Sequence, residues 1–191
     1  MILISMPEIN NIFSFFCHQT VERSPQFGGD IFPVCFRCAG IYLGIFSAYI
    51  TMLLSKRFLR TPASKKEILL LSFLFLPLMI DGLGNALSLW QSSPLIRSTT
   101  GILTGIFLAT VLIPFLPFNK AKKNFIEHFN AGYILFPILS AFLLIILLLF
   151  PINKIVFNAL SFFTASGLIL ILINLFLFWK YYNPNVVNNN I

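Results

Sequence analysis

Long apolar runs alternate with short polar segments along most of the chain. Five runs approach the length of about 20 apolar residues that a helix needs to cross a bilayer. They cover residues 39–55, 68–90, 98–118, 131–151 and 155–179. None shows the strict apolar–polar alternation of a lipid-facing barrel strand. The pattern predicts one membrane domain over residues 1–191, an all-α polytopic helical bundle with about five transmembrane helices.

The N-terminal residues follow a different pattern. Apolar residues recur at helical spacing, and Pro7 stands where a first helical turn tolerates proline: the apolar set is Ile9, Ile12, Phe13 and Phe16. The run has no basic start and contains polar residues, so it does not resemble a secretory signal. We expect residues 7–19 to form an amphipathic helix at the membrane interface, with a buried re-entrant segment as the alternative.

Composition supports a membrane location. Of the 191 residues, 58% are hydrophobic and only 10% are charged, and the mean hydropathy is +0.89. Soluble domains carry roughly 25% charged residues, so this chain has too little polar surface for a globule in water. We therefore expect the lipid bilayer as its main partner. The net charge of +7 is explained by basic loops near anionic lipid head groups, and no nucleic-acid role follows from it.

Lysine and arginine counts predict the orientation, because short cytoplasmic loops are enriched in both. Nine basic residues fall on the side of loops 56–66 and 119–130 and the C-terminal tail, against four on the other side: Arg23, Arg37, Arg97 and Lys154. The two loops are therefore predicted to be cytoplasmic in a multi-pass plasma-membrane protein. The segment 20–38 is then an extracytoplasmic loop.

That segment and its flank contain all the cysteines. Cys35 and Cys38 form a C-x-x-C pair, and Cys17 and His18 precede them. The intervening stretch holds four turn-forming residues, which are Pro25, Gly28, Gly29 and Pro33. A turn there would fold Cys17 and His18 back onto the C-x-x-C pair. Three thiols and one imidazole are a common tetrahedral zinc set, and iron is also possible.

Other interpretations of the cysteines stay open. Adjacent residues rarely both bind one metal, so Glu22, Asp30 or water can supply the fourth ligand in place of His18. C-x-x-C is also the spacing of disulfide-exchange proteins, and on the outer side of a membrane it could pass electrons between thiols and a quinone. The plainest alternative is a structural disulfide or a pair of inert thiols between Cys35 and Cys38.

Charged residues near the thiols extend the candidate site. Glu22, Arg23 and Arg37 stand close to the cysteines in sequence, where they could bind a carboxylate or phosphate. Equally, Glu22 could pair with one of the two arginines at the interface, which contributes little.

Asp81 is the one acidic residue within a predicted span, so a partner in the bundle interior is expected. Asn85 and Ser88 share its helical face. Arg97, at the outer end of the next helix, is a candidate partner for Asp81, a bound anion or lipid phosphate. A transporter or assembly factor that uses Asp81 as an ion site is a third functional class.

Two G-x-x-x-G pairs predict close helix packing. Gly40 and Gly44 lie in the first predicted span, and Gly101 and Gly105 lie in the third. Contact between these spans would bring Arg37 and Cys38 beside the start of the third one.

The motif "CHQTVERSPQFGGDIFPVCFRCAGIYLG" resembles the opening signature of a prokaryotic membrane-protein family, domain of unknown function 2085. The matching positions are Cys17, His18, Gln19, Glu22, Arg23, Ser24, Cys35, Arg37, Cys38, Gly40, Ile41, Tyr42 and Gly44. A second region matches at Asp81, Arg97, Gly101 and Gly105, while Asn85 stands where members often have glutamine. The resemblance covers about residues 13–110. It implies a small multi-span membrane protein and no established activity.

Together these patterns predict a metal site on the extracytoplasmic side. Its expected ligands are Cys17, His18, Cys35 and Cys38, with zinc as the favoured metal. An adjacent polar pocket would contain Asp81, Arg97, Glu22, Arg23 and Arg37 as the candidate catalytic residues. If the chain is an enzyme, we expect an anionic or lipid-like substrate. The sequence leaves the oligomeric state open.

Overall fold

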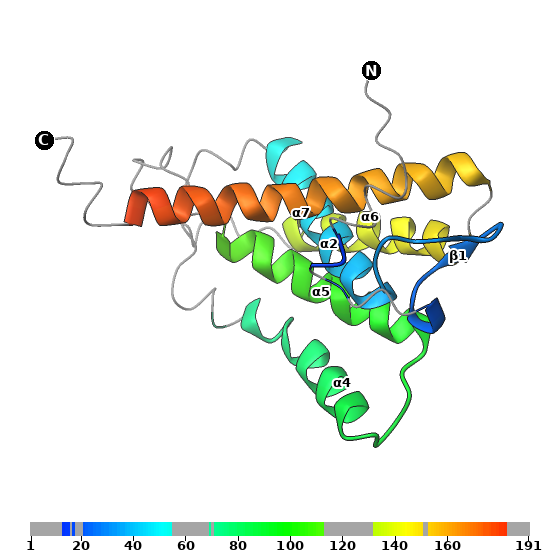
Figure 1. The fold of residues 1–191 in the computed structure, drawn as a ribbon. Helices are drawn as coiled ribbons and strands as arrows, with labels where there is room; N and C mark the ends of the chain where they lie inside the picture. Colours follow the sequence, from blue (N-terminus) through cyan, green and yellow to red (C-terminus); the bar gives the residue numbers. More distant parts are fainter. Residues whose placement is uncertain are drawn as a thin grey trace, which may run out of the picture.

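The computed structural model describes residues 13–15, 17, 21–54, 69, 71–112, 132–150 and 153–182. Within these ranges the chain is mostly helical, in agreement with the predicted helical bundle. Its elements are η1 (Val21–Arg23), β1 (Gln26–Phe27), β2 (Asp30–Ile31), α2 (Phe36–Leu54), α4 (Leu76–Ala86), α5 (Pro94–Leu112), α6 (Gly132–Leu149) and α7 (Lys154–Tyr182). Helix α2 packs against α5, α6 and α7, whereas α4 projects from the bundle beside α5 (Figure 1).

Glycine allows α2 and α5 to pack backbone to backbone. A Cβ atom added at Gly40 would meet the backbone of Ser98, and one at Gly101 would meet the carbonyl of Arg37. Gly44 and Gly105 lie in similar contacts further along the two helices, so α2 and α5 run parallel. This confirms the predicted contact between the first and third spans, including the position of Arg37 beside the start of α5.

The core lies along α2, between α5, α6 and α7. Its fully buried apolar side chains include Leu43, Ile45, Ile106 and Ile145. Helix α7 also approaches α2 closely, since a Cβ at Gly167 would meet the backbone of Tyr42. The N-terminal ends of α2, α5 and α7 consequently gather at one end of the bundle (Figure 1).

Two of the described helices are long and apolar enough to cross a membrane. The qualifying windows are Pro94–Val111 in α5 and Lys154–Ile173 in α7. The α7 window is 33% buried, and Ile155, Phe162 and Ile169 are exposed on it, so one part of this apolar helix faces away from the core. Helices α2 and α6 carry shorter apolar segments, Phe36–Thr51 and Pro137–Leu149.

The helix predicted over 68–90 is shorter in the structure. Residues 73–75 form a turn, and α4 extends only from Leu76 to Ala86. Pro77 explains the break, because its ring clashes with the carbonyl four residues earlier and it lacks an N–H donor. Eleven residues rise about 16 Å, roughly half the thickness of the hydrocarbon core.

The end of α4 is a Schellman motif. Leu89 N–H donates to the Gly84 carbonyl at 2.9 Å, and Ser88 N–H donates to the Asn85 carbonyl at 3.2 Å. Ser88 adopts the left-handed conformation, with φ of 56°, that this motif requires. The chain then turns back toward α5, where Ser93 caps the new helix by accepting a hydrogen bond from Ile96 N–H at 3.3 Å.

A β-hairpin that the sequence analysis did not predict covers the end of the bundle at which α2, α5 and α7 begin. Gly28 and Gly29 have φ of 59° and 89°, as the tight turn between antiparallel strands needs. Phe32 packs edge-on against Phe157 of α7, with ring centroids 5.3 Å apart. The hairpin thereby brings the chain that precedes it back toward the start of α2.

Most of the predicted interfacial helix 7–19 lies outside the described residues, as do loops 56–66 and 119–130. In the described part, Cys17 N–H donates to the Phe13 carbonyl at 2.9 Å, which is one helical turn. The Phe13 side chain is fully buried against Tyr42 of α2, with ring centroids 5.9 Å apart. This turn is therefore anchored in the core of the bundle.

Candidate metal centre and adjoining arginine cluster

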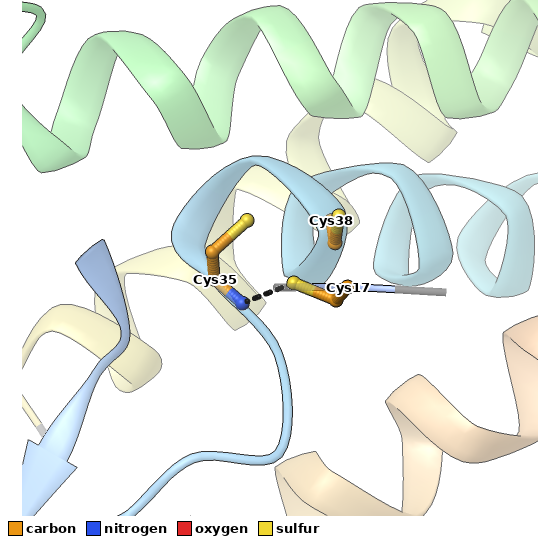
Figure 2. Close-up of side chains that lie close together, drawn as sticks. All are labelled: Cys17, Cys35 and Cys38. Atoms are coloured by element: carbon orange, nitrogen blue, oxygen red, sulfur yellow. Dashed lines mark hydrogen bonds between the residues drawn. The ribbon is translucent and has the colours of Figure 1, made fainter. Parts of the chain in front are cut away.

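The structure brings the three cysteines together. The Sγ atoms of Cys17, Cys35 and Cys38 all lie within 4.8 Å of one another, and no disulfide links them. Figure 2 shows Cys17 approaching the first turn of α2, from which Cys35 and Cys38 project. Three sulfurs bound to one tetrahedral zinc ion at 2.3 Å would be about 3.8 Å apart, so small side-chain movements would bring three of the four ligands into place.

Local structure explains why the thiols converge. Ala39 N–H donates to the Cys35 carbonyl at 2.9 Å, so the C-x-x-C pair occupies the first turn of α2 and both thiols lie on one side of it. Cys17 is carried there by the helical turn that starts at Phe13 and by the hairpin. Cys35 N–H also donates to Cys17 Sγ at 3.3 Å, as Figure 2 shows. A backbone N–H directed at sulfur orients the ligand and favours its thiolate form.

The close packing of the thiols also affects their protonation. Hydrogen bonding with Cys17 raises the pKa of the Cys35 thiol above its ordinary value of 9.0, and burial raises it further. Without a metal the thiol therefore stays protonated at neutral pH. A bound cation would reverse this preference, because a coordinating thiol is deprotonated outright.

Three residues were considered as the fourth metal ligand, and the structure answers differently for each. His18 lies outside the described residues. Asp30 pairs instead with Lys154 at the N-terminus of α7, with 2.7 Å between Oδ2 and Nζ. Glu22 is exposed in η1 and makes no ion pair with the described part of the chain. Within the described ranges, no other histidine or carboxylate joins the three sulfurs.

Asp81 is the centre of a second polar cluster. It is only 4% exposed and forms an ion pair with Arg37 Nη2. Ser92 donates its hydroxyl to Asp81 Oδ1, and Asn85 Nδ2 donates to the same oxygen at 3.2 Å. The structure therefore pairs Asp81 with Arg37 and not with the candidate partner Arg97. The glycine contacts bring the start of α2 against α5, and α4 lies beside α5, so Arg37 reaches Asp81. Asn85 shares the Asp81 face as predicted, whereas Ser88 is exposed at the helix end.

Arg97 lies beside this cluster. Its Nη2 donates to Asn85 Oδ1 at 3.3 Å. Arg23 and Arg37 lie close enough to Arg97 to repel it electrostatically, whereas the Asp81 carboxylate attracts it. The arginines are therefore neighbours of one another and of the thiols. The Nε–H groups of Arg37 and Arg97 are buried and have no acceptor in the described part of the chain.

Comparison with known proteins places the chain in a family. A family model described as predicted membrane protein (DUF2085) matches residues 17–111. The chain belongs to the DUF2085 family. The match begins at Cys17 and extends into α5, so the DUF2085 region contains the thiols, the Asp81 cluster and the three arginines, while α6 and α7 lie outside it.

Two archaeal relatives are similar to this DUF2085 protein. An uncharacterized protein of Methanothermobacter thermautotrophicus is 35% identical over 116 residues, which cover 61% of this chain and 95% of the relative. An uncharacterized protein of Methanocaldococcus jannaschii is 28% identical over 114 residues, which cover 60% of this chain and 71% of the relative. No solved structure matches the chain.

Sequence reasoning missed two features of the DUF2085 site. Ser92 was not predicted as a partner of Asp81, and the Arg37–Asp81 ion pair was not foreseen. The glycine pairs did indicate that Arg37 lies near this cluster. They predict that Arg37 lies opposite Gly101, one helical turn from Arg97, which was the candidate partner of Asp81. Ser92 carried no comparable signal, because its position depends on the turn after α4.

Proposed function

We propose that this DUF2085 protein is a membrane metalloprotein that binds one zinc ion through Cys17, Cys35 and Cys38. The observation that supports this proposal is the convergence of three thiols within 4.8 Å, with a backbone N–H directed at one sulfur. Soft thiolate ligands select zinc, and iron is the second choice for such a set. An inert group of buried cysteines would not need this arrangement on two separate segments.

His18 is the proposed fourth ligand. Three cysteines and one histidine would close a structural zinc site, whereas water in the fourth position would leave it open to substrate. The chain offers a matched test in its two histidines. His18→Ala should lower zinc affinity, while His128→Ala should leave it unchanged.

The metal site is proposed to face the extracytoplasmic side of a multi-pass protein in the plasma membrane. The parallel directions of α2 and α5 support the multi-pass arrangement, because the chain between them has to return. The proposed orientation follows from the lysine and arginine counts of the loops. The basic loops 56–66 and 119–130 then belong to the cytoplasmic side. Cysteine-accessibility labelling of intact cells with a membrane-impermeant reagent would test the orientation.

The proposed activity uses the polar cluster beside the metal. This activity requires water in place of His18 in the fourth position, since only an open zinc site would polarise a substrate group or activate water. Arg97 and Arg23 would attract an anionic or lipid-like substrate, and Asp81 would act through Arg37 by holding its guanidinium in place. Glu22 is exposed and has the weakest support as a catalytic residue.

The first experiment is elemental analysis of the detergent-purified chain, with free thiols counted on the same sample. About one zinc per chain, lost in Cys35→Ser, is the expected result. Zinc-free protein whose thiols become available only after reduction would overturn the proposal in favour of quinone-linked thiol oxidation. Loss of function in Asp81→Asn with all cysteine variants active would instead favour a transporter or assembly factor.

A further inference from the structure

We infer that Arg37, Arg97 and Arg23 form a binding site for a phosphate monoester group, next to the thiols and separate from the metal ligands. This names the ligand class of the polar cluster in the proposed function, but it does not depend on the identity of the metal. Three observations carry it: the charge of the cluster, the fixed orientation of two guanidinium groups, and their unused donors.

The cluster carries an excess of positive charge. Arg37 pairs with Asp81, and Arg97 lies close enough to Arg23, Arg37 and Asp81 to interact with their charges. Glu22 is exposed without an ion pair in the described part of the chain. The net charge of the three arginines and Asp81 is therefore +2. A phosphate monoester carries about −1.5 to −2 charges at neutral pH, so it matches this excess, whereas a single carboxylate leaves half of it unbalanced.

Two of the guanidinium groups are held in place before any ligand binds. Arg37 is fixed through Nη2 by Asp81, which is itself held by Ser92. Arg97 is fixed through Nη2 by the Asn85 amide, 3.3 Å away. A ligand that binds such pre-oriented groups loses less conformational entropy than one that must order free arginines.

The unused donors indicate where the ligand lies. Arg37 Nε and Arg97 Nε are both buried without a described acceptor. A buried donor left unpaired is destabilising, and the more so when it belongs to a charged group. The oxygens of a phosphate group accept such N–H groups in the paired geometry that arginine favours. Arg23 is exposed in η1 and close enough to Arg97 to act on its charge, so it adds the third positive charge.

Two sources can supply this group, a phosphorylated lipid head group and a soluble phosphate ester. Both present the same dianion to the arginines. The test therefore has two arms on the purified full-length chain. Isothermal titration uses glycerol phosphate for the soluble arm, and nanodiscs of phosphatidylcholine with or without phosphatidic acid serve for the lipid arm.

The decisive variant is Arg97→Gln. It removes a charge from the site but keeps an amide that can bond to Asn85, so the fold should persist. Lys154→Gln is the matched control, since it removes the same charge from the exposed pair with Asp30. We expect Arg97→Gln to weaken phosphate binding at least about tenfold in whichever arm binds. Lys154→Gln should change it by less than about twofold.

The inference is overturned if neither arm shows saturable binding, or if both variants weaken it equally. Equal affinity for glycerate, in which a carboxylate replaces the phosphate, overturns the ligand class. Zinc analysis of the same samples separates this inference from the proposed function. Arg97→Gln should retain zinc while it loses phosphate binding, and loss of zinc in Arg97→Gln would mean that the arginines only balance the charge of the metal–thiolate group.

Discussion

The buried ion pair between Arg37 and Asp81 joins the thiol-bearing turn of α2 to α4, and its removal gives a sharp test of the structure. Arg37→Met eliminates the guanidinium but keeps a long side chain of similar reach. Asp81 would then remain 4% exposed and would keep neutral donors such as Ser92 and Asn85. Removing one partner of a buried pair costs about 3–5 kcal/mol, because the other charge is left uncompensated.

The structure favours the lower end of this range. The Arg37 side chain is 27% exposed, so the pair is partly solvated, and two hydrogen bonds to Asp81 survive the change. We therefore expect the free energy of unfolding to fall by about 3 kcal/mol. For a domain of this size that corresponds to a decrease in Tm of about 6–12 °C.

Thermal unfolding in detergent measures the effect, and a double-mutant cycle isolates it. The double variant of Arg37→Met with Asp81→Asn should be more stable than Arg37→Met alone, because no buried charge is left. Lys154→Met is the control, since its pair with Asp30 is 65% and 41% exposed and should contribute less than about 1 kcal/mol. A Tm for Arg37→Met no lower than that of Lys154→Met would refute the reasoning. The zinc content should stay unchanged in every variant.

Three further predictions concern packing, caps and protonation. Gly101→Ala should lower the free energy of unfolding by at least about 3 kcal/mol, because the added Cβ meets the backbone of α2. Gly82→Ala has open space around it and should be neutral or stabilising, and thermal unfolding of both variants checks this. Ser88→Gly should raise the Tm slightly, since glycine adopts the positive φ at this helix end without strain. Because the pKa of the Cys35 thiol is raised, zinc must displace its proton, so competition titrations should show zinc affinity increasing with pH, and a flat profile would contradict three-thiolate binding.

The helices were predictable from sequence because apolar length and glycine spacing are local properties. The predicted spans 39–55 and 155–179 overlap α2 and α7. The two glycine pairs alone predicted the α2–α5 contact. The range 68–90 shows where this fails. The hydropathy pattern stays apolar across Pro77, which interrupts the helix, and across the residues after Ala86, where the chain turns back.

The site was predictable in its residue types but not in its pairings. Cysteine spacing and the turn-forming residues indicated that Cys17 would return to the C-x-x-C pair, as the structure finds. The partner of Asp81 also depended on how α4 lies against α2, a tertiary property that the glycine pairs do not specify. The sequence analysis therefore placed Asp81, Arg37 and Arg97 in one pocket but offered only Arg97 as a candidate partner for Asp81.

The position of Arg37 between the two cysteines links the metal centre to the polar cluster. At about 100° per residue, Arg37 projects about 100° away from Cys38 and about 160° away from Cys35. One helical turn can therefore direct two thiols at a metal and a guanidinium at α4 at the same time. Since α4 contacts the bundle mainly along α5, the Arg37–Asp81 pair is its polar tie to α2. A ligand that accepts the unpaired Nε–H of Arg37 while this pair stays intact would add a second tie at the same place, so anion binding should raise the Tm without changing the zinc content.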